Sequence, residues 1–221
     1  IISKYAGRLT RGQIFTNIVN IANRQVFIQK DFKRLIAYSS IAHVGLIAAG
    51  ILSMNIMALQ GGVFQMLSHG VNAVGMFFIA DILLKRLKDR DMSEMGGIAH
   101  VSSPFAITFM IILLGSVALP LTNGFVGEFL LLRGIYESNV WIGAIAGTTI
   151  ILGAVYMLRL FQKSMFGNKS SFTEHFADLS FSERAVLLPL TIMVFWMGLY
   201  PNSFLKLTEP AVSNLLQMIH Y

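Results

Sequence analysis

The sequence predicts an all-α integral membrane protein with about five transmembrane helices, the third of them broken within the membrane. Its 221 residues are 55% apolar and only 13% charged, and the mean hydropathy is +0.66. A soluble domain carries about 25% charged residues, so this chain has too few polar groups to cover a surface that faces water. The 17 Lys and Arg residues lie in short clusters between apolar runs, and not on one face as nucleic-acid binding requires. These observations exclude a soluble globule, a disordered tail, a coiled coil and a nucleic-acid partner.

Five apolar runs place the predicted transmembrane helices. A helix that crosses a hydrocarbon core about 30 Å thick needs about 20 apolar residues. The sequence meets this requirement at residues 35–54, 58–84, 104–136, 141–161 and 185–205. We therefore expect a membrane domain over residues 28–205.

The two ends of the chain differ from this domain. Residues 1–27 contain too many Lys, Arg and Asn residues for a membrane crossing, and are expected to lie at the membrane surface or to be out of frame. Residues 206–221 predict an amphipathic tail. Because the chain begins with Ile1 and not with methionine, we expect a piece of a longer protein or an incomplete reading frame.

The loop charges test this topology independently. If each run crosses once, eleven Lys and Arg residues fall on one side of the membrane and two on the other, apart from those in residues 1–27. Basic residues favour the cytoplasmic or matrix side. Four or six crossings would mix the two groups, so the distribution favours five.

The third run contains signals for a break in its helix. Pro120 lacks a backbone N–H and clashes with the preceding turn, and the pair Asn123-Gly124 favours non-helical dihedrals. Glu128 then falls near the start of the second half, where unpaired backbone N–H groups favour a carboxylate and burial favours the neutral acid. A carboxyl under both influences is suited to exchange protons. The alternative is a loop between two short helices, with Glu128 solvated at an interface.

The second run carries a polar stripe on one helix face. Its residues are Gln65, Ser68, His69 and Asn72, which lie within roughly a 100° arc. His69 is close to the middle of the run, and histidine exchanges protons near neutral pH. The stripe is interpreted either as part of a wet internal path or as ordinary interhelical hydrogen bonding.

A third polar group lies in the first run. Ser39, Ser40 and His43 share a helix face there, and a packed, hydrogen-bonded histidine is the simpler interpretation of His43. Asp81 is predicted to pair with Lys85, one turn later.

The sequence contains no sign of a cofactor or metal site. It has no cysteine, no glycine-rich phosphate loop, no dinucleotide fingerprint and no His-Glu-x-x-His motif. We therefore expect no cofactor and no metal in this chain.

Four segments in order resemble the antiporter-like membrane subunits of respiratory complex I. They are DFKRLIAYSSIAHVG at residues 31–45, QMLSHG at 65–70, RDMSEMGG at 90–97 and PLTNGFVGEF at 120–129. Sister chains in this family commonly carry a lysine where this chain has Glu128, and the glutamate points to the M-type branch, called chain 4 in mitochondria. The resemblance covers about residues 28–221.

The resemblance implies a partial antiporter-like fold and a role in proton translocation. Glu128, His69 and His43 would then form the proton relay. A supporting polar axis would include Gln65, Ser68, Asn72 and Lys33. NADH and quinone would be handled by other subunits, the partners would be other membrane-arm subunits and lipid, and the location would be the bacterial plasma membrane or the mitochondrial inner membrane. The family's first-half carriers, a glutamate and lysines, have no counterpart in this chain.

Three hypotheses for the function follow. The first is a membrane-arm subunit of proton-pumping NADH:quinone oxidoreductase that carries part of a proton channel, and hence part of an enzyme with no redox centre in this chain. The second is a subunit of a cation/proton antiporter or a membrane-bound hydrogenase, which gene neighbourhood would distinguish. The third is an inactive truncated fragment with a structural role, which upstream sequence would reveal.

Overall fold

The computed structural model describes residues 29–92, 95–168 and 173–219, so the predicted segment 1–27 lies outside the described residues. In this part of the chain every regular element is a helix. In chain order these are α3 (Phe32–Leu52), α4 (Ile56–Leu87), the short 3₁₀ helix η1 (Ile98–His100), α5 (Ser103–Ser116), α6 (Asn123–Ser138), α7 (Val140–Met165), α8 (Phe181–Leu199) and α9 (Asn202–Ile219).

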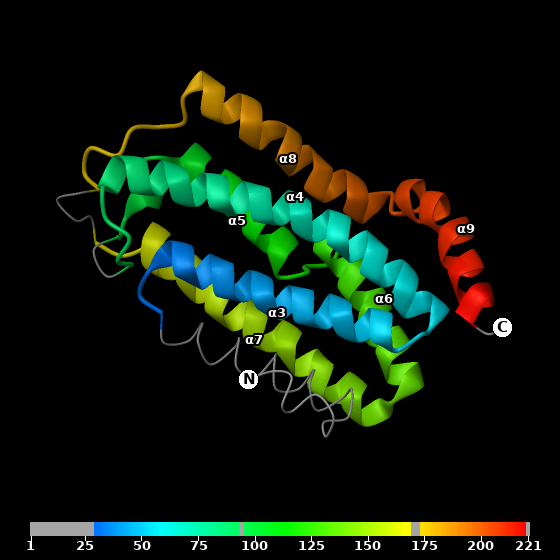
Figure 1. Ribbon diagram of the computed structural model, residues 1–221. Coiled ribbons are helices and arrows are strands. Elements are labelled where there is room, and N and C mark those ends of the chain that lie inside the picture. Colours follow the sequence, from blue (N-terminus) through cyan, green and yellow to red (C-terminus); the bar gives the residue numbers. More distant parts are fainter. Residues whose placement is uncertain (1–28, 93–94, 169–172, 220–221) are drawn as a thin grey trace.

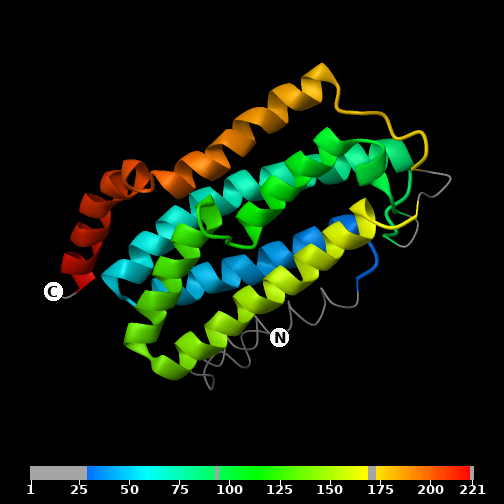
Figure 2. The same ribbon diagram turned by 180° about the vertical axis from the view of Figure 1, so that it is seen from behind.

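The long helices run side by side as an elongated bundle. α3 lies between α4 and α7, α8 runs along the other side of α4, and α9 leaves the bundle at an angle to α8 (Figure 1). Figure 2 shows α5 and α6 across α3 and α4 on the opposite side. By length and composition, α3, α4, α7 and α8 are each able to cross a membrane. With α5 and α6 as the two halves of a broken helix, this is the five-helix membrane fold that the sequence predicts.

Side-chain caps set where several helices begin. Asp31 accepts a hydrogen bond from Arg34 N at the start of α3, and Asn55 accepts from two backbone N–H groups at the start of α4. Asn139 ends α6 and also caps α7, accepting from Trp141 N and Ile142 N. These short connections make α3/α4 and α6/α7 antiparallel pairs, in which residues equally far from the turn lie at the same level.

The predicted fifth run, residues 185–205, is not one helix. α8 begins earlier, at Phe181, because Ser180 and Glu183 form a capping box, and it ends at Leu199. Pro201 follows and has no N–H to continue the ladder, and α9 begins at Asn202, four residues before the predicted tail. The apolar composition continues across this break, which is why hydropathy alone missed it.

Two apolar clusters occupy opposite ends of the bundle interior. The larger joins α3, α4, α5 and α7 and contains a run of ring contacts, with centroids 5.8 Å apart for Phe32–Phe109 and 5.1 Å for Phe109–Phe161. The smaller consists of Leu46, Ile47, Ala49, Leu131, Ile135 and Ala146. The buried polar residues of α3, α4 and α6 lie between the two clusters.

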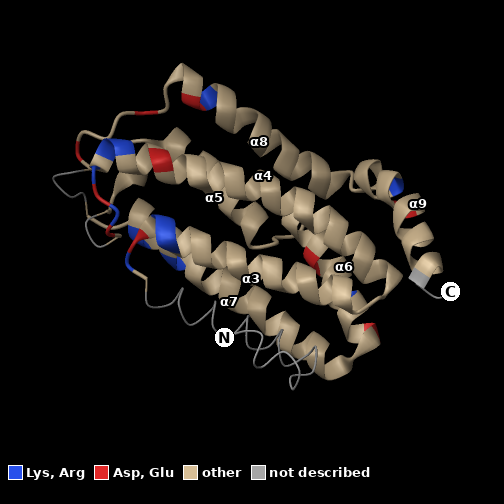
Figure 3. Cartoon of the chain, viewed as in Figure 1, with Lys and Arg blue, Asp and Glu red and all other residues tan. Residues whose placement is uncertain are grey.

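Basic residues gather at the end of the bundle where α3 begins and α4 ends (Figure 3). The sequence assigns the positively charged loops to this same side of the membrane. Lys85 Nζ lies 2.7 Å from Asp81 Oδ2, so the predicted ion pair is confirmed.

A charged network ties the loop before α8 to this end. Arg86 pairs with Glu183 and donates to the Asp178 carbonyl, while the Asp178 carboxylate accepts from Ser102 Oγ at 2.6 Å and lies 3.0 Å from Arg184 Nη2. The hydrogen bond from Ser102 lowers the pKa of Asp178, with further lowering from the Leu179 N–H and the two arginine charges.

This lowered pKa predicts a pH-dependent contribution to stability. A carboxyl whose folded-state pKa is depressed stabilises the fold above its unfolded value of about 3.9, and the contribution is lost as the pH falls through the folded value. Asp178→Asn should therefore lower the free energy of unfolding of the protein in detergent at pH 7 by less than about 1 kcal/mol, because the pair is largely exposed, and lower the thermal midpoint accordingly. In circular-dichroism melts the deficit should be smaller near pH 3 than at pH 7, whereas the exposed control Glu209→Gln should show none. An equal deficit at both pH values would contradict this assignment.

Candidate functional site

The predicted break in the third apolar run is present between α5 and α6. Residues 117–122 are not helical, and Ala118 and Leu121 have φ angles of 56° and 77°. Pro120 is exposed, and Thr122 Oγ1 donates to the Leu119 carbonyl at 2.6 Å to close the turn. The break brings the start of α6 against the end of α5.

Gly124 makes this approach possible. A β-carbon at that position would overlap the carbonyl oxygen of Gly115 and lie 3.4 Å from Ala118 Cα. These are backbone atoms of α5 and of the connecting segment, so they have no rotamer by which to move aside. Glycine at 124 therefore fixes how the second half of the helix restarts.

Glu128 lies in the second turn of α6 with its side chain only 2% exposed. Its Oε1 is 2.9 Å from His43 Nδ1 of α3 and accepts from Gln65 Nε2 of α4 at 3.3 Å. The sequence led us to expect backbone N–H groups at the helix start as its partners. The structure gives it side-chain partners from two other helices, and the alternative of a solvated carboxyl is excluded.

A second histidine continues this chain of polar groups. The rings of His43 and His69 have centroids 5.5 Å apart, and His69 Nε2 lies 2.6 Å from Ser40 Oγ. Glu128 of α6, His43 and Ser40 of α3 and His69 of α4 therefore form one continuous cluster in the interior.

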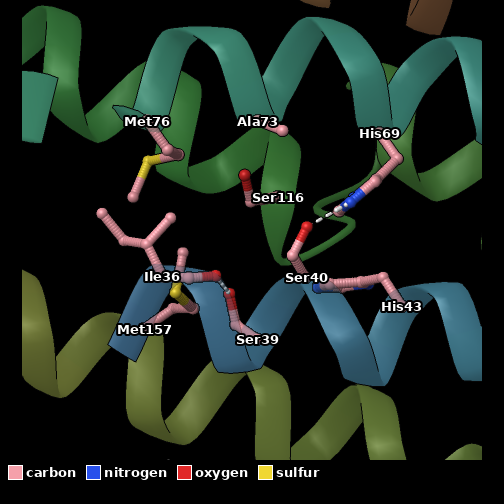
Figure 4. Close-up of a pocket in the computed structure, with 9 residues that line it drawn as sticks. All are labelled: Ile36, Ser39, Ser40, His43, His69, Ala73, Met76, Ser116 and Met157. Atoms are coloured by element: carbon pink, nitrogen blue, oxygen red, sulfur yellow. Dashed lines mark hydrogen bonds between the residues drawn. The ribbon is translucent and has the colours of Figure 1, made fainter. Parts of the chain in front are cut away.

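A small cavity lies beside this cluster. Its volume is about 20 Å³, and Figure 4 shows Ser40 and His69 hydrogen-bonded to one another among the residues that line it, which also include Ser39 and Ser116. Ile36, Met76 and Met157 line the rest. A space of this size with several polar partners is sufficient for one water molecule.

The polar stripe of α4 divides between two neighbours. Gln65 contacts Glu128, while Asn72 Oδ1 and the Ser68 carbonyl accept from Asn123 Nδ2 at 3.1 and 3.3 Å. These three stripe residues face α6 and tie the broken helix to α4, whereas His69 faces α3. Asn123 therefore contributes to the break as predicted and also anchors it.

Lys33 is the predicted site residue that the structure does not bring to the cluster. It is exposed in the first turn of α3, ten residues before His43, which corresponds to about 15 Å along the helix. Sequence reasoning also missed Ser116, which lines the cavity, and the buried polar residues Thr149 and Tyr156 of α7. The signal for Thr149 was present, because it shares a helix face with the small residues Ala146 and Gly153, a face suited to burial.

The fold and the site together define an antiporter-like membrane subunit, and comparison with known proteins agrees. The family model described as "NADH:quinone oxidoreductase/Mrp antiporter, TM" matches residues 15–153. The chain belongs to this family of transmembrane subunits, as the four sequence segments indicated.

Several relatives carry the name subunit M or chain 4. NADH-quinone oxidoreductase subunit M of Rickettsia prowazekii is 42% identical over 92% of this chain and 42% of its own length, and that of Rhodobacter capsulatus is 36% identical over 94% and 40%. NADH-ubiquinone oxidoreductase chain 4 of Marchantia polymorpha is 38% identical over 92% and 40%. The M-type assignment is thus confirmed, and the chain spans about two fifths of the length of these relatives.

Solved structures show the same fold. A chain of respiratory complex I from Thermus thermophilus with bound NADH superposes with a TM-score of 0.87 at 28% identity, covering 98% of this chain and 45% of that one. A chain of the Mrp complex from Dietzia sp. gives 0.83 at 17% identity, covering 93% and 46%, and supports the fold alone. The chain is part of a multi-pass membrane protein.

Proposed function

We propose that this chain is part of a membrane-arm subunit of proton-pumping NADH:quinone oxidoreductase and carries part of its proton path. The observation that carries the proposal is the carboxyl of Glu128, nearly fully buried between apolar clusters and 2.9 Å from His43 Nδ1. Ionisable groups at such depth are costly and mark ion or proton pathways. Broken helices at membrane depth commonly build such sites.

The geometry supports a stepwise transfer. A water in the cavity would exchange a proton with His69 through Ser40, and His69 would pass it to His43 by ring rotation or through water, because the two rings are 5.5 Å apart. His43 Nδ1 then gives the proton directly to Glu128 Oε1 along their contact. Imidazole is suited to this role because it takes a proton on one nitrogen and releases one from the other.

The apolar clusters keep the transfer from becoming a leak. The larger cluster lies between the histidines and the basic end, and the smaller one lies beyond Glu128 toward the α6–α7 turn. Protons therefore reach and leave the cluster of Glu128, His43, Ser40 and His69 only when the packing or hydration around it changes. We propose that quinone reduction in partner subunits drives that change, with NADH and quinone bound elsewhere in the complex.

The same cluster would also serve a cation/proton antiporter or a membrane-bound hydrogenase. The family description that matches this chain includes the Mrp antiporters. Neighbouring genes for quinone-reductase subunits favour our proposal, whereas genes for antiporter subunits or a hydrogenase favour the alternative. If the chain is instead an inactive fragment, its buried cluster would have no function in either kind of complex.

Neutralising Glu128 tests the proposal. In membrane vesicles that contain the complex assembled with this chain, Glu128→Gln keeps the shape of the side chain and one acceptor oxygen but removes the proton it exchanges. We expect the number of protons translocated per NADH oxidised to fall, with the complex assembled at its normal level.

The matched control is Glu137→Gln on the same helix, because Glu137 is exposed and pairs with Arg133 at 3.2 Å. It should pump like the wild type. Unchanged pumping in Glu128→Gln would remove Glu128 from the mechanism.

A further inference from the structure

α7 carries two buried polar residues that take no part in the histidine chain. Thr149 is 4% exposed and Tyr156 is 2% exposed. They are seven residues apart, about two turns, and so lie on the same side of the helix. The hydroxyl of Tyr156 would lie 3.6 Å from a β-carbon on Gly153, so it extends along α7 toward Thr149.

Helix register places Thr149 at the level of the carboxyl. The smaller apolar cluster draws its residues from three helices, among them Leu46 of α3, Leu131 of α6 and Ala146 of α7. His43 lies three residues before Leu46, and Glu128 lies three residues before Leu131. Because α7 runs antiparallel to α6, the residue of α7 at the same level comes three residues after Ala146, and this residue is Thr149. One helical turn from the cluster, the three helices therefore present His43, Glu128 and Thr149 on the same side.

Four buried polar atoms near this level have no hydrogen-bond partner within the described ranges. They are Glu128 Oε2, Gln65 Oε1, Ser68 Oγ and Thr149 Oγ1, and each of the four residues is more than nine-tenths buried. An unmade hydrogen bond on a buried atom costs about 1–3 kcal/mol, and buried polar groups are commonly satisfied by bound water. The set combines hydroxyl groups, which donate or accept, with carbonyl and carboxylate oxygens, which accept.

We infer that Thr149 belongs to the proton site, where its hydroxyl holds bound water against Glu128 Oε2 and gives the carboxyl a second proton connection on the α7 side. This inference rests on the proposed function. Oε1 faces His43 and receives a proton there, while the O–H bond at Oε2 breaks as its proton passes to the water held by Thr149. Tyr156 extends this connection along α7.

Three threonine variants in the assembled complex test the inference. Thr149→Val removes the hydroxyl and keeps the shape, Thr149→Ser keeps the hydroxyl, and Thr148→Val alters the exposed neighbour whose Oγ1 donates to the Ile145 carbonyl at 2.7 Å. We expect Thr149→Val to lower proton translocation per NADH at least about twofold and to change its pH profile. Thr149→Ser and Thr148→Val should match the wild type in both measurements.

Two outcomes would overturn the inference, and they are distinct from failure of the proposed function. Equal losses in Thr149→Val and Thr149→Ser would indicate packing and no role for the hydroxyl. Wild-type pumping and an unchanged pH profile in Thr149→Val would exclude the second connection while Glu128→Gln still pumps poorly. If Glu128→Gln itself pumps normally, the proposed function fails instead.

Discussion

Replacing Gly124 by valine is expected to abolish assembly of the broken helix. A β-carbon at Gly124 would overlap the Gly115 carbonyl oxygen and lie 3.4 Å from Ala118 Cα, and valine adds two further carbons to it. Overpacking a well-packed interior costs about 1–3 kcal/mol, and here the clash is with backbone that has no rotamer to change. We therefore expect the amount of this chain in the purified complex, measured by immunoblot, to fall at least about tenfold.

Gly147→Val is the matched control. Gly147 lies on α7, and a β-carbon there would have nothing within 4 Å. This variant should assemble at the wild-type level, so a low level in Gly124→Val alone reports the contact at the break. Normal assembly and pumping in Gly124→Val would show that the approach of α5 and α6 does not hold the site together.

The consequence of this contact for the site is geometric. Glu128 is four residues after Gly124, one turn along α6, so the position of the helix restart sets where its carboxyl points. Asn123 holds the same restart to α4 through Asn72 and the Ser68 carbonyl. The break thus places the carboxyl of Glu128 between His43 and Gln65, and the geometry of the buried cluster depends on this break.

The helices and the break could be predicted from the sequence because their signals are local. Long apolar runs mark membrane helices whatever packs beside them, and proline followed by Asn-Gly marks a break within one run. The boundary between α8 and α9 could not be read in this way, because apolar residues continue on both sides of Pro201 and only the loss of one backbone donor separates the helices.

The composition of the site was predictable, but its pairings were not. His43, His69 and Glu128 are recognisable as ionisable residues within apolar runs. Which of them touch depends on the rotation of each helix about its axis, so the side-chain partners of Glu128 replaced the expected backbone N–H groups. Thr149 was missed because its place on the small-residue face of α7 indicates only burial, and a threonine in a membrane helix points to no chemistry until a buried carboxyl is known to lie at its level.

The most direct test of the account is to observe the proton on Glu128 by infrared difference spectroscopy of the complex during a pH titration. A protonated carboxyl in an apolar interior has its own C=O stretching band, separate from those of solvated acids. We predict a band that changes with pH and shifts in D₂O, that is lost in Glu128→Gln and that persists in Glu137→Gln. In His43→Leu the band should remain but exchange with D₂O more slowly, because the adjoining proton donor is gone. Spectra of the wild type and Glu128→Gln that coincide at every pH would contradict the claim that this buried acid takes up and releases protons.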